Sequence, residues 1–193
     1  MQKIVFATNN QHKLKEAREI LSDFEIFSQA EAGFFDEVIE DGISFTENAL
    51  KKATAVSLFT NSIVFADDSG ICVDALNGTP GIYSARWSGE GDDANNRKLL
   101  KKMKSKTDRS AHFHCAIALV YPVAQNKEPE ILEAHWHGTI ATEIQGENGF
   151  GYDSVFIPGG YTKTSAELST EEKNRMSHRF LALMQLKRIL SNM

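Results

Sequence analysis

Two adjacent aspartates at the end of an apolar run are the first candidates for chemistry. The sequence Phe65-Ala66-Asp67-Asp68-Ser69-Gly70 directly follows Ser62-Ile63-Val64. An apolar strand directs its end into the fold, where an ionised carboxylate is costly unless a cation meets it. If the strand continues through both aspartates, their side chains point to opposite faces, so we expect one to brace the loop and the other to act. Carboxylate oxygens suit Mg²⁺, which shares its coordination shell with substrate phosphates, although an acidic turn after the strand is the alternative.

A polar loop between the first expected strand and helix is the second candidate. The residues Thr8-Asn9-Asn10-Gln11-His12-Lys13 follow the apolar run Ile4–Ala7. Free backbone N–H groups and the helix dipole favour an anion at such a place. A lysine in the first helical turn opposes the dipole by roughly 0.3 to 1 kcal/mol, and a bound phosphate would reverse that sign. The alternative is a solvated Lys13 beside ordinary polar caps.

Three further segments carry residue types suited to binding. Glu40-Asp41-Gly42 precedes a capped helix, and it can equally form an ordinary turn. In the segment 148–153, glycines bracket aromatic residues, so a ligand can approach the backbone and a base can stack on a ring; a tight turn with core aromatics is the alternative. The segment 172–179 is dense in cations, which a solvated helix face would also explain. Together these groups provide phosphate donors, carboxylates for a metal and a platform for a base, which is what a nucleotide enzyme requires.

Four histidines have the spacing of metal-binding pairs. His112, His114, His135 and His137 alternate with other residues on two expected strands. No acidic partner accompanies them in the pattern, so we expect structural or exposed histidines. Trp87 and Trp136 are expected to be packing residues.

The elements that must position these groups alternate between strand and helix, which is typical of an α/β fold. The expected strands are Ile4–Ala7, Ile63–Ala66, His112–Tyr121, Ile131–His137 and Val155–Ile157. The expected helices include one that carries Leu14, Ala17, Leu21 and Phe24, one that begins at a capping box Ser44-Phe45-Thr46-Glu47, Asn95–Met103, and Phe180–Leu190. A second capping box is expected at Ser169-Thr170-Glu171-Glu172.

Length and composition limit the class of protein. The 193 residues, 41% of them hydrophobic and 24% charged, predict a single domain, 1–193, with a sizeable core. The net charge of −5 lacks the basic excess of a nucleic-acid binder. Cys72 and Cys115 are far apart and make no CxxC or zinc spacing. Met1 leads straight into the run Ile4–Ala7, without the charged segment and long apolar stretch expected of a signal peptide, and no run approaches the ~18 apolar residues of a membrane span. We therefore expect a cytoplasmic protein with no membrane or nucleic-acid partner.

Five segments, taken in order, resemble the inosine triphosphate pyrophosphatase family, the noncanonical purine nucleoside triphosphate pyrophosphatases. They are Thr8–Lys13, Glu40–Ala53, Phe65–Trp87, Asn148–Asp153 and Thr164–Arg179, and they contain the motifs ADDSGICVDALNGTPGIYSARW and EKNRMSHR. The resemblance implies Mg²⁺-dependent hydrolysis of ITP, dITP and XTP to the monophosphate and pyrophosphate, which cleanses the nucleotide pool. It also implies a single elongated domain with a mixed β-sheet and flanking helices, two lobes around a central active-site cleft, and a homodimer.

The same resemblance assigns roles to individual residues. It implies that Glu40 and Asp68 are metal ligands and that Asp68 is also the catalytic general base. The phosphate and sugar contacts that it implies are Thr8, Asn9, Asn10, Lys13, Lys52, Ser69, Arg86 and Lys173. The base-recognition residues that it implies are Phe150, Gly151, Tyr152, Asp153, His178 and Arg179. Asn9 departs from the pattern, because many relatives carry glycine there, although asparagine tolerates a positive φ better than most residues.

Selectivity has a physical basis, and two other functions stay open. Donors aimed at the 6-oxo group of hypoxanthine or xanthine would face the amine of adenine, and such a site can discriminate by ~10⁴ or more, so ATP is expected to be rejected. One alternative is a pyrophosphatase that acts on other nucleotides, such as pyrimidines. The other is a nucleotide-binding regulator without turnover, which would not need Glu40 and Asp68 together.

Overall fold

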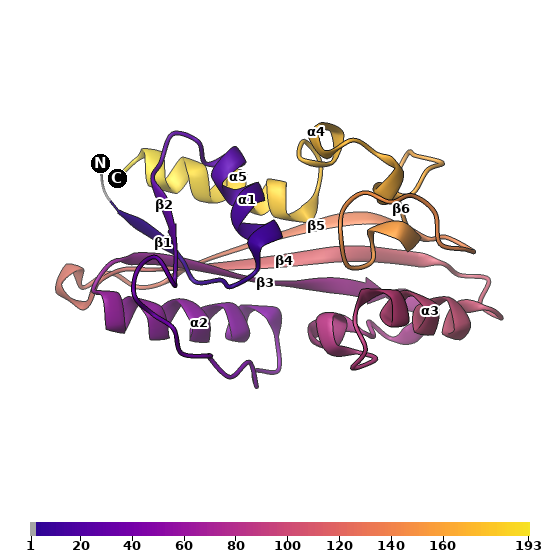
Figure 1. Cartoon of the computed structure of the whole chain (residues 1–193), viewed down its shortest axis with the longest axis horizontal. Helices are drawn as coiled ribbons and strands as arrows, with labels where there is room; N and C mark the ends of the chain where they lie inside the picture. The colour runs from indigo at the N-terminus through magenta and orange to yellow at the C-terminus, as the bar shows by residue number, and fades with distance from the viewer. Residues whose placement is uncertain (1–2) are drawn as a thin grey trace. The chain divides into compact units, whose positions relative to one another are not determined.

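The structure is a computed structural model that describes residues 3–193. Six strands form one sheet in the order β2-β1-β3-β4-β5-β6 (Figure 1). The strands are β1 (Ile4–Phe6), β2 (Ile26–Ser28), β3 (Ile63–Val73), β4 (Ser110–Val120), β5 (Glu130–Ile140) and β6 (Phe156–Pro158). Strand β1 pairs in parallel with β2 and β3, whereas β5 and β6 are antiparallel, so the sheet is mixed.

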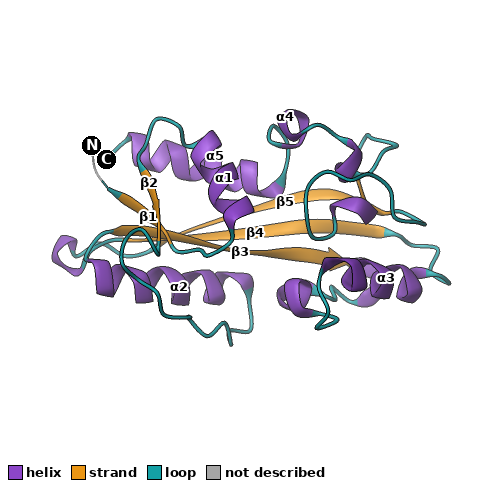
Figure 2. Ribbon diagram, in the orientation of Figure 1, coloured by secondary structure: helices purple, strands orange, loops and turns teal. Residues whose placement is uncertain are grey.

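Helices flank the strands, as the expected α/β class requires (Figure 2). The α-helices are α1 (Gln11–Ile20), α2 (Phe45–Thr60), α3 (Asp92–Met103), α4 (Thr170–Lys173) and α5 (His178–Ser191). Short 3-10 helices cover Asp74–Leu76, Gly81–Arg86, Val123–Gln125, Asp153–Val155 and Ser165–Glu167. None of the described helices combines the length and apolar character needed to cross a membrane.

The chain divides into two compact units. Unit 1 takes in the chain up to Asp68 together with Cys115–Ala134 and Arg179–Met193. Unit 2 comprises Ser69–His114 and His135–His178. Strands β3, β4 and β5 each have residues in both units.

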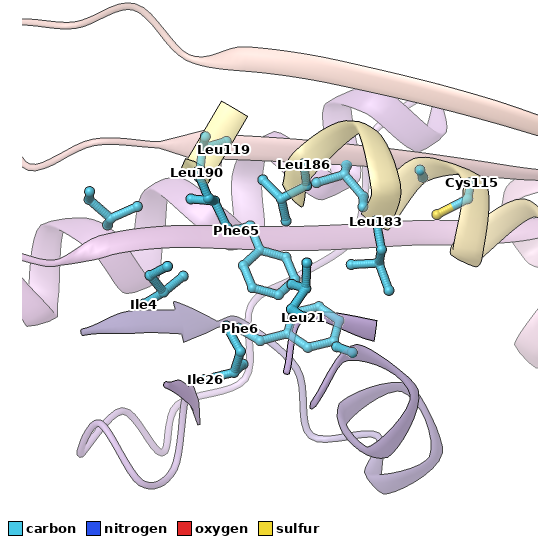
Figure 3. Packing of buried hydrophobic residues seen from close by; sticks show 14 of the residues in the cluster. Ile4, Phe6, Leu21, Ile26, Phe65, Cys115, Leu119, Leu183, Leu186 and Leu190 are labelled. Atoms are coloured by element: carbon cyan, nitrogen blue, oxygen red, sulfur yellow. The ribbon is translucent and has the colours of Figure 1, made fainter. Parts of the chain in front are cut away.

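Unit 1 has an apolar layer on each face of its strands, because successive strand side chains point to opposite faces. On one face, Phe6 and Phe65 pack with Leu21 near α1 and with Leu183 and Leu186 of α5 (Figure 3). On the other face, the neighbouring strand residues Val5 and Val64 pack against Ala49, Ala53 and Val56 of α2. Strands buried on both faces are continuous in apolar character, which explains the run before Asp67.

Unit 2 has a core of its own. Ile71 and Val73 of β3, Phe113 of β4 and Trp136 of β5 pack with α3 through Leu99 and Met103. Tyr152, Val155 and Phe156 join the same cluster. The segment that carries the expected base-binding residues is therefore anchored in this core.

Of the two capping boxes expected from the sequence, one forms both of its hydrogen bonds and the other forms only one. Ser169 and Glu172 form both reciprocal hydrogen bonds of the box before α4. Before α2, Ser44 Oγ accepts from Glu47 N, but the Glu47 carboxylate accepts from the Ile43 N–H at 3.0 Å and not from Ser44. The second half of the expected box at Ser44 is therefore wrong by one residue.

Two strands of the structure differ from the sequence-based expectation. Strand β3 was expected to end at Ala66, but it continues through both aspartates to Val73. The continuation is possible because two cations meet the Asp67 carboxylate and an amide meets that of Asp68. Strand β2 was not predicted, since Ile26-Phe27-Ser28 forms neither a longer apolar run nor an alternation. The remaining strands and helices were predicted to within a few residues at their ends.

Candidate active site

Asp67 is a buried carboxylate held by two cations of unit 1. Its Oδ1 lies 3.0 Å from Lys13 Nζ of α1, and its Oδ2 lies 3.2 Å from Arg179 Nε of α5. Arg179 Nη1 also donates to Glu16 Oε2 at 2.6 Å, and the Arg179 side chain is 3% exposed. Burial alone would raise the pKa of Asp67, but the positive charges of Lys13, Arg179 and Lys52 outweigh it and hold that pKa far below its usual value. Asp67 is thus an ionised group at neutral pH that joins α1 and α5 to β3.

Asp68 has a different environment on the side of α2. Its Oδ2 accepts from Asn48 Nδ2 at 3.0 Å, and Asn48 Oδ1 accepts from the Gly42 N–H at 2.8 Å. Burial raises the pKa of Asp68, and the charge of Glu40 adds to this effect, whereas Lys52, Asn48 and Lys13 oppose it. Two consecutive carboxylates therefore have pKa values shifted in opposite directions, which is a common sign of different roles.

Asn48 joins the loop of Glu40 to the strand of Asp68. A Cβ at Gly42 would lie 2.7 Å from Asn48 Oδ1, so the backbone of this loop approaches the amide closely only because residue 42 is glycine. Asn48 was not singled out from the sequence. The sequence signal for Asn48 is that a polar residue shares one helical face with the apolar residues Phe45 and Ala49. In the structure, Asn48 is fully buried.

Glu40 forms an ion pair with Lys52 of α2. The distance from Lys52 Nζ to Glu40 Oε2 is 2.8 Å, and the two side chains are 14% and 33% exposed, respectively. Glu40 is thus partly accessible, in contrast to Asp67. The expected metal ligand and an expected phosphate contact are direct neighbours.

The donor set of Glu40 and Asp68 fits Mg²⁺. Among residues 3–193, no three His, Cys, Asp or Glu side chains are grouped so that they could hold a metal ion. Mg²⁺ does not require such a cage, because it is usually bound by one or two carboxylates, several waters and substrate phosphates. Glu40 is partly accessible, and its negative charge contributes to the raised pKa of Asp68.

The loop 8–13 uses its polar side chains to begin α1. Asn10 Oδ1 accepts from the N–H groups of His12 and Lys13 at 2.9 and 3.2 Å, and Thr8 Oγ1 accepts from Asn10 N at 3.1 Å. Asn10 is thus the N-cap residue, a role that asparagine fills well. Outside glycine, the positive φ values in the described chain belong to Asn61, Asn77 and Asn126, so Asn9 needs no unusual backbone.

The loop 148–153 of unit 2 is organised by Asp153. The Asp153 carboxylate accepts from the Phe150 N–H at 2.9 Å, from Ser165 Oγ at 2.8 Å and from Lys173 Nζ at 2.6 Å. Lys173 Nζ also lies 4.9 Å from the centre of the Phe150 ring. The Tyr152 side chain is buried, and its hydroxyl donates to Ser84 O at 2.9 Å. Phe150 is therefore the more accessible of the two rings.

His178 lies in an aromatic stack in unit 2. Its ring is nearly parallel to that of Phe113, at 4.7 Å and 7°, and Trp136 follows at 6.5 Å. Lys173, His178 and Arg179 are all buried, so the segment 172–179 is not simply a solvated helix face. His178 belongs to unit 2, whereas Arg179 belongs to unit 1.

Ser69 and Arg86 are the remaining expected contacts, both in unit 2. Ser69 is half-buried in β3, directly after Asp68. Arg86 is exposed, and its guanidinium lies 5.3 Å from the Tyr83 ring. The structure thus distributes the expected site residues over the two units. The expected metal ligands, Glu40 and Asp68, are in unit 1, and the loop 148–153 is in unit 2.

The fold and these groups define a class, an α/β protein equipped for phosphate and base recognition. Residues 4–189 match the Ham1 family, and the chain belongs to that family. The dITP/XTP pyrophosphatase of Desulfotalea psychrophila is 51% identical over 95% of this chain and 83% of the relative. The dITP/XTP pyrophosphatase of Bacillus subtilis is 45% identical over 98% of each.

Solved structures agree with this assignment. The Ham1 protein of Staphylococcus aureus superposes with a TM-score of 0.90 at 41% identity, covering 99% of both chains. A HAM1 protein from Coxiella burnetii has a TM-score of 0.91 at 40% identity, covering 100% of both chains. The family resemblance found in the sequence is confirmed.

Proposed function

We propose that this protein hydrolyses dITP, ITP and XTP to the nucleoside monophosphate and pyrophosphate, and so removes deaminated purines from the nucleotide pool. The observation that carries the proposal is the contrast between Asp67, which is held by Lys13 and Arg179, and Asp68, which accepts a hydrogen bond from Asn48 and whose pKa is raised by burial. The dITP/XTP pyrophosphatases with 45 to 51% identity support the same activity.

Unit 1 has the groups for the reacting phosphates. Glu40 and Asp68 would hold Mg²⁺, which when bound neutralises phosphate charge and makes an attacking water more acidic. Lys52 now pairs with Glu40, and phosphate oxygens would offer it a second anionic partner. The side chains of Lys13, Thr8, Asn9 and Asn10 surround the start of α1, where anions are favoured.

Asp68 is the residue that acts on water. A carboxylate with a raised pKa is a better proton acceptor than an ordinary one. In the proposed step, Asp68 orients a water and takes its proton while the water oxygen attacks the α-phosphorus. The bond from the α-phosphorus to the bridging oxygen breaks, and pyrophosphate leaves with the electron pair.

Unit 2 has the groups for the base and the sugar. Phe150 offers an aromatic face, and Asp153 with Lys173 fixes the loop that carries it. We assign base recognition to Phe150, Gly151, Tyr152, Asp153 and His178 of this unit, together with Arg179 of unit 1. Ser69 and Arg86 are assigned to phosphate or sugar oxygens.

We also propose that residues 1–193 form one domain that acts as a cytoplasmic homodimer. The match to the family over 4–189 supports the single domain. Two free cysteines, one buried and one half-buried, are compatible with a reducing compartment.

Product analysis tests the function directly. The purified protein would be incubated with Mg²⁺ and, in separate reactions, with ITP, XTP, dITP, GTP, ATP or dTTP. Pyrophosphate from ITP, dITP and XTP, with little from ATP, is the expected result. Pyrophosphate mainly from dTTP would favour a pyrophosphatase for other nucleotides, and nucleotide binding without turnover would favour a regulator.

A further inference from the structure

One turn of α3 holds both backbone polar groups of Gly151. The Gly151 N–H donates to Asp92 Oδ2 at 2.7 Å, and Asn96 Nδ2 donates to Gly151 O at 2.9 Å. Asp92 and Asn96 are four residues apart, so their side chains lie on one face of the helix. Both belong to unit 2, as does Gly151.

The same helix also forms a hydrogen bond with the end of this loop. Asn96 Nδ2 also donates to Ser154 Oγ at 3.1 Å. Both hydrogens of this amide are therefore directed at the segment 151–154. The Asn96 side chain is 3% exposed, and its Oδ1 is buried without a hydrogen-bond partner in the described chain. Its two donated bonds thus account for the orientation of the amide.

Packing alone does not fix Gly151. Its φ is +64°, and a Cβ at this residue would meet no other atom within 4 Å. The loop is open on that side, and the hydrogen bonds from α3 hold the peptide groups on either side of Gly151. Phe150 and Tyr152 are attached directly to those peptide groups.

Asp92 is well suited to this role. It is the first residue of α3, where a negative charge is favourable at the positive end of the helix dipole. The N-cap residue Gly91 has no side chain that could cap the helix. The Asp92 carboxylate therefore serves the helix start and the Gly151 N–H together.

We propose that Asp92 and Asn96 are positioning residues for the base-binding loop 150–153 and that they determine selectivity between purine bases. This proposal rests on the proposed function of that loop. Hydrogen bonds weaken steeply with distance and angle, so a site that reads a 6-oxo group needs its groups fixed. Neither Asp92 nor Asn96 is assigned a contact with the nucleotide.

The test compares Asp92→Ala and Asn96→Ala with a matched control on the same helix. Asp93 is the adjacent residue, is 80% exposed and pairs with Arg97, so Asp93→Ala leaves the loop untouched. We expect Asp92→Ala to raise KM for ITP and to lower the ITP-to-ATP ratio of kcat/KM by about tenfold, with kcat for ITP nearly unchanged. Asp93→Ala should keep the wild-type ratio, and Asp92→Asn, which retains an acceptor oxygen for the Gly151 N–H, should restore most of it.

Equilibrium binding of IMP and AMP to the same variants separates this inference from the proposed function. If wild-type protein prefers IMP but does not turn over ITP, the proposed pyrophosphatase activity is contradicted. The positioning role of Asp92 and Asn96 is then still supported if their alanine variants lose the IMP preference. An unchanged IMP preference in both alanine variants would overturn the positioning role, whatever the turnover. A wild-type protein that does not distinguish IMP from AMP would overturn it as well.

Discussion

Asp67 and Asp68 are consecutive residues of β3, and their carboxylates are held from opposite sides by different partners. Asp67 meets Lys13 and Arg179, whereas Asp68 meets the amide of Asn48. The pKa of Asp67 is lowered and that of Asp68 is raised. The alternation of a strand therefore converts two identical side chains into one structural ion and one group available for chemistry.

Replacing Asp68 by asparagine is expected to remove turnover and to spare folding. The isosteric amide cannot accept a proton, so kcat with ITP should fall by at least about 10²-fold, and nucleotide binding should be largely retained. Burial raises the pKa of Asp68, so its ionised form opposes folding once the pH rises above the ordinary aspartate range. The free energy of unfolding at neutral pH should therefore be equal to or higher than that of wild type in urea titrations. Near-native turnover in this variant would contradict the role of Asp68.

Replacing Asp67 by asparagine is expected, in contrast, to lower the free energy of unfolding. It would leave the buried Arg179 and Lys13 without their shared anion, and breaking such a pair typically costs 3–5 kcal/mol. The folded-state pKa of Asp67 is lowered, so its contribution is complete above about pH 4 and is lost as the pH falls further. Urea unfolding should show a deficit that is constant between about pH 7 and 5 and shrinks below about pH 4. Asp68→Asn is the matched control, and equal stability of the two variants would refute the proposed brace.

Local patterns predicted most of the elements. The alternation of Phe113, Cys115, Ile117 and Leu119 identified β4, and these side chains are all buried on the expected face. The capping residues Ser44 and Ser169 located the starts of α2 and α4. These signals work because they act over a few residues. The full length of β3 was missed because the charges that permit it come from elsewhere in the chain.

The partners within the site could not be read from the sequence for the same reason. Lys13 is 54 residues from Asp67, and Arg179 is 112 residues from it. The family resemblance assigned Arg179 to the base, and the structure adds its contacts with Asp67 and Glu16. The hydrogen bonds of Asp92 and Asn96 with Gly151 likewise join residues more than 50 positions apart in the sequence, and they depend on how α3 packs.

The histidines of β4 and β5 are expected to make unit 2 sensitive to acid. The His112 ring lies 5.3 Å from that of His135 and 5.4 Å from that of His137. Burial lowers the pKa of His112, the charges of His135 and His137 add to this, and Asp74 opposes it. A lowered folded-state pKa means that stability is present above about pH 6.5 and is lost as the pH falls through the folded-state pKa.

His112→Gln should therefore reduce the loss of stability between about pH 7.5 and 5.5 in urea unfolding. His12→Gln removes an exposed histidine outside this cluster, and its curve should parallel that of wild type. Parallel curves for His112→Gln and wild type would show that His112 does not contribute to the acid sensitivity.

Gly149 is expected to be essential for the base-binding loop. Its φ is +79°, and a Cβ there would lie 2.1 Å from Asp153 Oδ2. That oxygen accepts from the Phe150 N–H and from Lys173 Nζ, so the carboxylate cannot move without losing both contacts. Gly149→Ala should cost about 1–3 kcal/mol for the positive φ and a further 1–3 kcal/mol for the steric conflict.

Gly160→Ala separates these two costs. Gly160 has φ of +83°, but a Cβ there would meet nothing within 4 Å. Its loss of stability should therefore reflect the backbone alone, at about 1–3 kcal/mol, and KM for ITP should be unchanged. Gly149→Ala should be less stable than Gly160→Ala in urea unfolding and should also raise KM, because the displaced Asp153 no longer fixes Phe150. Equal stability and equal KM in the two variants would mean that Asp153 adapts to the added methyl group without releasing the loop.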